Sequence, residues 1–240
     1  IEVQKELAQK DKMAALGRFS AGIAHEINNP LGTILVTAGM LKEAASAGKS
    51  IPPEDFDAII EEVRRCRDII STLRTYTGRT QPQLSPTTLG AFIGQVENFL
   101  KNEPAFKELT LAVEKPLDES LKLMIDSKAM QQVFSNLTRN ALEAMNDINP
   151  KIMRITSEIL QDHIKIKVQD HGRGFECLPE HIFEPLFTTK AQGTGLGLVI
   201  CQAIIDGHHG KIEAARFESG ITEFCIQLPV AEIFKRNTEE

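Results

Sequence analysis

The sequence lacks the features that mark several large classes of protein. Its 27 lysines and arginines are mixed among 33 acidic residues and form no basic cluster, so we expect no nucleic-acid partner. No apolar run approaches the roughly 20 residues that a membrane helix needs, so we expect no direct membrane contact by this chain. The four cysteines are far apart and lack zinc-site spacing, which indicates a packing role in a reducing, cytoplasmic compartment.

The start of the chain lacks a secretory leader, and its first residue is not Met. The pattern there is helical, so we expect the chain to be a fragment of a longer protein, whose preceding part has room for a sensor or a membrane anchor. The 240 residues, 42% of them hydrophobic and 25% charged, are typical of a globular protein of one or two domains.

Residues 1–79 show the apolar periodicity of helices, interrupted once by a connection rich in Gly, Ser and Pro at residues 46–53. This pattern predicts a helical hairpin. Two helices bury little surface alone, so we expect a homodimer in which two hairpins form a four-helix bundle. The second arm carries apolar residues at the spacing of a bundle seam: Phe56, Ile59, Val63, Cys66, Ile70 and Leu73.

A polar, Pro-containing stretch predicts a linker at residues 80–86, followed by a second domain at 87–235 and a tail at 236–240. Strand patterns and helix patterns alternate in this domain, which predicts an α/β sandwich with one mixed sheet and helices on one face. The predicted strands are 109–113, 122–125, 153–159, 163–168, 211–215 and 222–228, and the predicted helices are 89–100, 128–145 and 196–206.

His25 is predicted to face solvent on the first helical arm. At about 100° per residue, Asn29 and Gly32 fall on the same side as His25, whereas Ile27 and Ile34 fall on the opposite side. The small or polar neighbours of His25 leave room for a large ligand to approach the imidazole ring.

Glu26 follows His25 and can accept the Nδ1 proton, which leaves the Nε2 lone pair free to act as a nucleophile. A zinc site of the HExxH type is excluded because position 29 is Asn. Residues 19–31 resemble the H-box of sensor histidine kinases. This resemblance implies that His25 is the phospho-acceptor, that Glu26 is the general base, and that Asn29 positions water for dephosphorylating the partner.

Two glycine-containing segments in the second domain suggest a nucleotide site. Asp170 ends a predicted strand beside Gly172 and Gly174, where its carboxylate suits an adenine amino group, although the same sequence also fits a simple turn. The other segment opens a predicted helix, where bare amides and the helix dipole favour phosphate. It has neither the Rossmann nor the Walker spacing. Its residues are Gly193, Thr194, Gly195, Leu196, Gly197 and Leu198.

Asn136 and Asn140 lie one turn apart on the predicted helix 128–145, where uncharged oxygens suit a Mg²⁺ that already carries triphosphate. Taken alone, the pair also fits the polar side of an amphipathic helix. Residues 183–190 form an irregular loop with two aromatic residues, which fits either a lid over nucleotide or an ordinary loop pinned by Phe183 and Phe187.

Together these segments resemble the N, G1, F and G2 boxes of the histidine-kinase-like ATPase domain, which also occurs in gyrase, MutL-type repair proteins and heat-shock chaperones. The similarity spans about residues 87–230. It implies ATP and Mg²⁺ as ligands, with Asn140 binding the metal and Asp170 reading adenine. The other implied nucleotide contacts are Asn136, Arg139, Gly172, Gly174, Phe187, Thr189, Lys190, Gly193, Thr194, Gly195, Leu196, Gly197 and Leu198.

The sequence departs from this family pattern in two places. Glu143 stands where many members have a basic residue, so Arg139 is expected to contact phosphate instead. The lid segment, residues 177–192, is short for the family. Residues 207–210, Gly-His-His-Gly, resemble the connection after the last ATP-site helix, and we interpret their histidines as structural.

The combined resemblance implies ATP-dependent autophosphorylation of His25 and phosphotransfer to an aspartate of a response-regulator receiver domain, with phosphatase activity toward that partner. One alternative is a dimeric, non-catalytic phosphotransfer scaffold, which the presence of Asn140 and Asp170 disfavours. Another is a clamp-type ATPase, which the His25–Glu26 pair on a helical hairpin disfavours.

Overall fold

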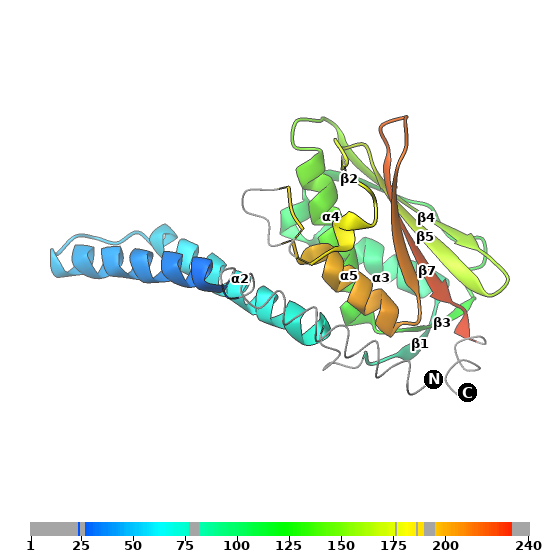
Figure 1. Cartoon of the computed structure of the whole chain (residues 1–240), viewed down its shortest axis with the longest axis horizontal. Helices are drawn as coiled ribbons and strands as arrows, with labels where there is room; N and C mark the ends of the chain where they lie inside the picture. Colours follow the sequence, from blue (N-terminus) through cyan, green and yellow to red (C-terminus); the bar gives the residue numbers. More distant parts are fainter. Residues whose placement is uncertain are drawn as a thin grey trace. The chain divides into compact units, whose positions relative to one another are not determined.

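The computed structural model describes residues 24, 27–76, 82–175, 177–185, 187–189 and 195–231. The chain divides into two units, one made mainly of residues 1–80 and the other of residues 81–187 and 197–240. The predicted fold class, a helical part followed by an α/β part with a mixed sheet, is confirmed (Figure 1). Among the described residues, no helix has the length and hydrophobicity needed to cross a membrane.

The first unit contains a helical hairpin with one arm at residues 27–46 and the other in α2 (Glu54–Tyr76). The first arm ends where Gly48 takes a positive φ of 70° and the Lys49 N–H bonds the Ala44 carbonyl at 3.0 Å. Glycine tolerates this left-handed backbone without strain and commonly closes helices in this way. Acidic residues in the first turn of α2 favour its start, because the helix dipole is positive there.

The predicted seam of α2 divides into two rows of apolar residues. Ile59 and Cys66 are half-buried, whereas Phe56, Val63 and Ile70 are exposed. An exposed apolar row at helical spacing is unusual for a surface that faces only water. The hairpin therefore presents apolar area beyond that which its own two arms cover.

The second unit contains a five-stranded sheet in the order β2 (Leu109–Val113), β4 (Lys151–Ile159), β5 (His163–Asp170), β7 (Thr222–Pro229) and β6 (Lys211–Arg216). β2 pairs with β4 in parallel and all other neighbours are antiparallel, so the sheet is mixed as predicted. Burial alternates strictly along β5 and β7, which means that one face of the sheet is covered and the other is accessible.

Three helices cover the buried face: α3 (Leu89–Asn102), α4 (Ser127–Ala144) and α5 (Gly197–Gly207) (Figure 1). Thr88 caps α3 and Asp126 caps α4, each accepting the N–H three residues ahead. In the core, the rings of Phe92 on α3 and Phe134 on α4 meet edge to face with centroids 6.0 Å apart. The unit also contains two short 3₁₀ turns, η1 (Pro104–Phe106) and η2 (His181–Phe183).

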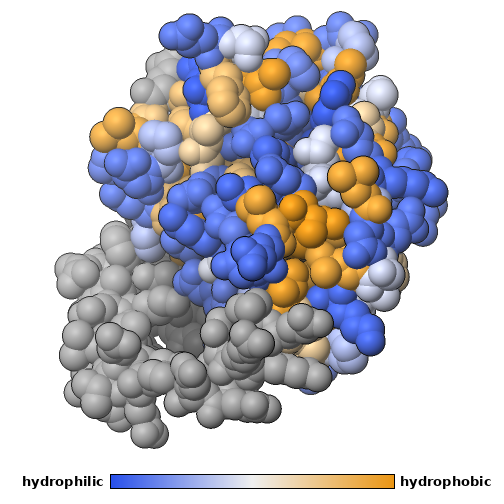
Figure 2. Space-filling view, turned by 90° about the vertical axis from the view of Figure 1, so that its right-hand side faces the viewer, coloured by the Kyte–Doolittle hydropathy of each residue, from blue (hydrophilic) through white to orange (hydrophobic). Residues whose placement is uncertain are grey.

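The other face of the sheet is polar. Lys167 on β5 pairs with Glu158 on β4 at 3.1 Å, and Gln169 on β5 donates to Glu223 on β7 at 2.7 Å. Figure 2 views the molecule from the side on which β4 and β5 lie in Figure 1, and hydrophilic residues cover most of that surface. These cross-strand pairs explain why the strands alternate between apolar and charged residues.

Two details of the sequence prediction are wrong. Ser85 and Pro86, assigned to the linker, lie in β1 (Ser85–Thr88), and the predicted strand 122–125 is not part of the main sheet. Instead, this strand, β3 (Lys122–Ile125), pairs with β1 in a separate antiparallel ribbon, where Pro86 lies opposite Met124. Proline lacks an N–H donor but is tolerated in such an edge strand, so its presence did not mark a loop.

A buried histidine joins the start of α4 to the end of α5. His208 is 1% exposed, its Nδ1 donates to the Ile204 carbonyl at 2.8 Å, and its Nε2 accepts the Asp126 N–H at 2.9 Å. Asp126 in turn accepts the Gln83 N–H at 2.8 Å, which fixes the chain just after the first unit. The structural interpretation of His208 is therefore supported, because both ring nitrogens are used by the neutral form.

We expect this histidine to make folding stability depend on pH. Burial lowers the pKa of His208, against the opposing effects of the Ile204 carbonyl and Asp126, while nearby His209 lowers it further. The unfolded state then binds a proton near pH 6.5 that the folded state does not, so stability falls as the pH drops below that value. The slope due to one such group is at most about 1.4 kcal/mol per pH unit.

Chemical denaturation of the wild type and of His208→Gln between pH 7.5 and 5.5 tests this expectation. Glutamine retains an acceptor for the Asp126 N–H but does not titrate, so this variant should lose less stability on acidification than the wild type. The matched control is His181→Gln, which replaces an exposed histidine paired with Glu184. An equal loss of stability in the wild type and His208→Gln would contradict the assignment.

Candidate functional site

Asp170 is the last residue of β5 and occupies a buried position of that strand, with only 4% of the residue exposed. Its Oδ1 accepts the Gly172 N–H at 2.8 Å. Burial raises the pKa of Asp170, while the Gly172 N–H and the nearby His171 act in the opposite direction. A buried carboxyl held by one backbone amide retains acceptor capacity for a ligand, which agrees with the chemistry predicted for this residue.

The loop after Asp170 requires glycine at two positions. A Cβ on Gly172 would lie 2.5 Å from the Ala144 Cβ and 2.8 Å from the Asp170 carboxylate, so no larger residue fits. Gly174 has a positive φ of 66°. The Arg173 N–H between them donates to the Ala144 carbonyl at 3.0 Å, which ties the loop to the end of α4. Both glycines of the predicted adenine segment therefore have a backbone reason to be glycine.

Thr222 is a candidate site residue that the sequence did not suggest. It is the β7 partner of Asp170, it is 3% exposed, and its buried hydroxyl has no hydrogen-bond partner among the described residues. A buried hydroxyl without a partner is costly unless a ligand or water completes it. The available signal was a polar residue at an inward position of a strand whose next inward residues are Phe224 and Ile226.

Asn136 makes a contact that the sequence analysis did not anticipate. Its Nδ2 donates to the Gly197 carbonyl at 3.1 Å, while the Cys201 thiol on α5 donates to the Val133 carbonyl on α4 at 3.8 Å. Asn136 thus links α4 to the first turn of α5. Burial raises the pKa of Cys201 to about 12, so this thiol is unreactive and serves packing, as predicted for the cysteines.

Asn140 and Arg139 lie one turn further along α4 from Asn136. Asn140 is half-buried, whereas Arg139 and Glu143 are exposed. The exposed guanidinium of Arg139, the residue before Asn140, is accessible to an anionic ligand. The arrangement is compatible with the predicted phosphate contact of Arg139.

The described part of the second glycine segment leads directly into α5. Gly195 has a positive φ of 61°, Leu196 is 4% exposed, and Gly197 is the first residue of the helix. Leu198 packs against the core. The first two residues of the predicted segment, Gly193 and Thr194, lie outside the described residues.

The predicted lid is described only in part. Phe187 is half-buried and packs against the core together with Phe183, as expected of an anchored loop. Thr189 is exposed, and Lys190 lies outside the described residues. Both interpretations of this loop, lid and pinned connection, are compatible with an anchor at Phe187.

His25 and Glu26 lie outside the described residues. Their helical neighbours follow the predicted pattern, because Asn29 and Gly32 are exposed whereas Ile27 and Ile34 are half-buried. The Asn29 carbonyl accepts the Thr33 hydroxyl at 3.3 Å, and this bond involves only the backbone of Asn29.

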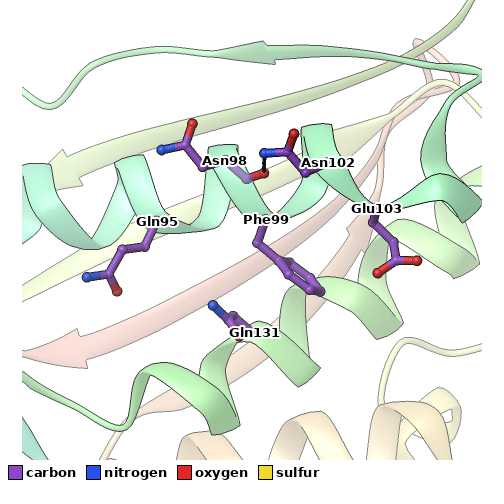
Figure 3. A pocket seen from close by; sticks show the side chains of 6 residues that line it. All are labelled: Gln95, Asn98, Phe99, Asn102, Glu103 and Gln131. Carbon is purple, nitrogen blue, oxygen red and sulfur yellow. Dashed lines mark hydrogen bonds between the residues drawn. The ribbon is translucent and has the colours of Figure 1, made fainter.

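Two of the open hollows on the surface of the second unit lie away from Asp170. One, of about 430 Å³, lies between α3 and α4 (Figure 3). The other, of about 640 Å³, lies around β6 and β7. Neither hollow is lined by Asp170 or by any of the predicted glycines. The candidate nucleotide site is therefore supported by the contacts and burial of Asp170, Gly172 and Thr222 and not by a hollow. The residues that line the first hollow are Gln95, Asn98, Phe99, Asn102, Glu103 and Gln131.

The described residues contain no group of three or more His, Cys, Asp or Glu side chains that is placed to hold a metal ion. Mg²⁺ commonly takes few protein ligands and completes its shell with phosphate oxygens and water. The half-buried carboxamide of Asn140 on α4 fits that mode of binding.

Comparison with known families agrees with both halves of the chain. Residues 15–81 match the His Kinase A (phospho-acceptor) domain. Residues 125–232 match the family described as histidine kinase-, DNA gyrase B- and HSP90-like ATPase.

Individual relatives and solved structures point the same way. The sensor histidine kinase ZraS of Escherichia coli O157:H7 is 32% identical over 95% of this chain and 49% of its own length. The histidine-protein kinase AtoS of Escherichia coli K12 is 30% identical over 95% of this chain and 37% of its own length. The chain thus spans about half or less of these curated relatives.

The catalytic domain of histidine kinase ThkA is 33% identical with a TM-score of 0.53, and the match covers 61% of this chain and 95% of that domain. A longer ThkA structure shares the fold over 95% of this chain, with a TM-score of 0.70 at 24% identity. The two domain matches, the ThkA catalytic domain and the curated relatives all agree: the chain belongs to the sensor histidine kinases of two-component systems.

Proposed function

We propose that this chain binds ATP with Mg²⁺, phosphorylates its own His25 and passes the phosphoryl group to an aspartate of a response-regulator receiver domain. The observation that carries the proposal is the buried Asp170 carboxyl, held by Gly172 opposite the Thr222 hydroxyl, which has no hydrogen-bond partner in the described part of the chain. A buried acceptor and a buried unpaired hydroxyl at one strand end suit a polar, flat ligand such as adenine.

The roles in the nucleotide site follow from position. The Asp170 carboxyl accepts a hydrogen bond from the adenine amino group. The Thr222 hydroxyl forms its hydrogen bond with the ligand or with a water beside the ligand. Asn140 binds the Mg²⁺, which supplies charge neutralisation for the triphosphate. The N-terminus of α5 at Gly197 and the guanidinium of Arg139 contact phosphate oxygens. The remaining proposed contacts are Asn136, Gly172, Gly174, Phe187, Thr189, Lys190, Gly193, Thr194, Gly195, Leu196 and Leu198.

The roles on the hairpin rest on the first helical arm. His25 acts as nucleophile through Nε2, and Glu26 holds the Nδ1 proton so that the ring keeps its reactive tautomer. Asn29, which is exposed one turn later, orients water for hydrolysis of the phosphorylated partner. The solved complex of ThkA with response regulator TrrA supports a receiver domain as the partner. Reaction in the cytoplasm, where ATP is available, agrees with four free cysteines.

We also propose that the hairpin forms a homodimer. The exposed apolar side chains of both arms support this proposal, since Leu35 is 74% and Val63 is 52% exposed. Two such hairpins cover these rows when they pack as a four-helix bundle. The domain boundaries that we propose are 1–79 for the hairpin, 80–84 for the linker, 85–235 for the ATP-binding domain, which includes β1, and 236–240 for the tail.

Replacing Leu35 with aspartate should weaken the dimer, because a charge cannot be buried in the bundle without a partner. Sedimentation velocity should show a shift from dimer to monomer at micromolar protein. Leu178→Asp is the matched control, since Leu178 is 59% exposed but lies on the ATP-binding unit. A Leu35→Asp protein that sediments like the wild type would exclude this row from the dimer interface.

Incubation with γ-labelled ATP and Mg²⁺, followed by acid and alkaline treatment, tests the proposed activity. A phosphohistidine loses its label in acid and keeps it in base. The kinase proposal predicts a base-stable label on the protein. ATP turnover without any label would favour the clamp-type ATPase, and absence of both would favour the non-catalytic scaffold.

A further inference from the structure

Arg216 lies beside the candidate adenine site, although neither its position nor its residue type marked it in the sequence. It is the last residue of β6 and pairs across the sheet with Thr222 on β7. Thr222 pairs on its other side with Asp170 on β5. The backbones of Asp170, Thr222 and Arg216 therefore form one row across the end of the sheet.

The side chain of Arg216 reaches over the loop that follows Asp170. Its Nη1 donates to the Phe175 carbonyl at 3.1 Å. Its Nε and Cδ lie 2.9 and 3.0 Å from the point where a Cβ of Gly174 would stand. The Thr222 hydroxyl lies 2.9 Å from the same point. Gly174 is thus enclosed between the guanidinium stem and the unpartnered hydroxyl.

The contact with Arg216 is expected to restrict the conformations of the loop that follows Asp170. Gly172 and Gly174 allow many backbone conformations in the absence of a restraint, and ordering them on ligand binding costs entropy. A guanidinium that bonds the Phe175 carbonyl and packs against Gly174 restricts those conformations before the ligand arrives. The Arg173 bond to Ala144 holds the same loop from the side of α4.

We propose that Arg216 is a positioning residue that preorganises the adenine-binding loop, residues 172–175, and thereby raises affinity for the nucleotide base. This inference rests on the proposed function, in which Asp170 and this loop hold adenine. Arg216 acts on the base end of the ligand, whereas the phosphates are proposed to lie near Asn140 and α5. It therefore changes binding of ATP, ADP and adenosine alike and leaves the transfer step unchanged.

The test compares Arg216→Ala and Arg216→Lys with the wild type in titrations of ATP and ADP and in rates of autophosphorylation. Loss of one such hydrogen bond and its packing should raise the Kd for both nucleotides by about threefold to tenfold. The apparent KM for ATP should rise by the same factor, while the rate at saturating ATP stays within about twofold. Lysine retains a cationic donor of similar reach, so it should recover most of the affinity.

Arg154→Ala is the matched control, because Arg154 is exposed on β4 of the same sheet and pairs only at 3.5 Å with Glu114. It should bind both nucleotides like the wild type. Unchanged affinity in Arg216→Ala, or a fall in the saturated rate at constant KM, would overturn the inference. Asp170→Asn distinguishes failure of the proposed function from failure of the role of Arg216. If Asp170→Asn loses affinity for ATP while Arg216→Ala keeps it, the proposed function stands and the role of Arg216 fails. If the wild type binds no ATP, the proposed function itself fails.

Discussion

Asp170→Asn is expected to bind ATP at least about 100-fold more weakly than the wild type, because it replaces a carboxylate acceptor with an amide. The carboxamide can turn its NH₂ toward the adenine amino group, where two donors repel each other. If it turns the other way, its NH₂ faces the Gly172 N–H, which Asp170 now accepts. Either orientation leaves a buried donor unsatisfied when the nucleotide is present.

The same substitution should not destabilise the free protein. Burial raises the pKa of Asp170, so the folded state holds this proton to a higher pH than the unfolded state does. The contribution of Asp170 to stability is therefore largest at low pH and falls as the pH rises through its folded pKa. A neutral amide removes that dependence, and thermal unfolding of Asp170→Asn at pH 7.5 should occur at or above the wild-type temperature.

Asp118→Asn provides the control for a general loss of negative charge. Asp118 is exposed and accepts the Ser120 N–H at 2.9 Å, much as Asp170 accepts that of Gly172. Isothermal titration of ATP should give Asp118→Asn a Kd equal to that of the wild type. If Asp170→Asn bound ATP within about threefold of the wild type, Asp170 would not read adenine.

His25→Gln is expected to lose all protein-bound phosphoryl label while keeping wild-type affinity for ATP. Glutamine has no ring nitrogen that can attack the γ-phosphate, and the nucleotide is proposed to bind on the other unit. The opposite pattern is expected for Asp170→Asn, which keeps the nucleophile but lacks nucleotide. His163→Gln is the control for loss of an ordinary histidine, since His163 pairs with Asp162 on the sheet. Label on His25→Gln equal to that of the wild type would contradict the assignment.

The element types of the second unit could be predicted from local sequence. Apolar and polar residues alternate within each strand, and apolar residues recur at helical spacing within each helix. Residues 109–113 and 122–125 form strands within the predicted limits. The partner of the second strand was not predictable in the same way. β3 pairs with β1, so its partner could be predicted only if Ser85–Thr88 had been recognised as a strand. Pro86 lies in that strand, and proline is locally typical of a loop.

The candidate site residues also divide into those that a local sequence pattern indicates and those that only strand pairing brings to the site. Asp170 and the glycines could be proposed from the sequence because strand, acid and glycine are neighbours there. Thr222 and Arg216 were missed because they reach the same strand end only through the β5, β7 and β6 register. Asn136 was expected at the nucleotide, and its bond to Gly197 is a contact between helices that no local pattern encodes.

The central claim is that the γ-phosphoryl group of a nucleotide held beside Asp170 is transferred to His25. It is tested most directly by locating the phosphoryl group after the wild-type chain has been incubated with ATP and Mg²⁺ and digested at alkaline pH. At an ATP concentration near the wild-type Kd, the account predicts one phosphoryl group, on the imidazole of His25, and almost none in Asp170→Asn. A phosphoryl group on a different residue, or on His25 in both proteins, would contradict it.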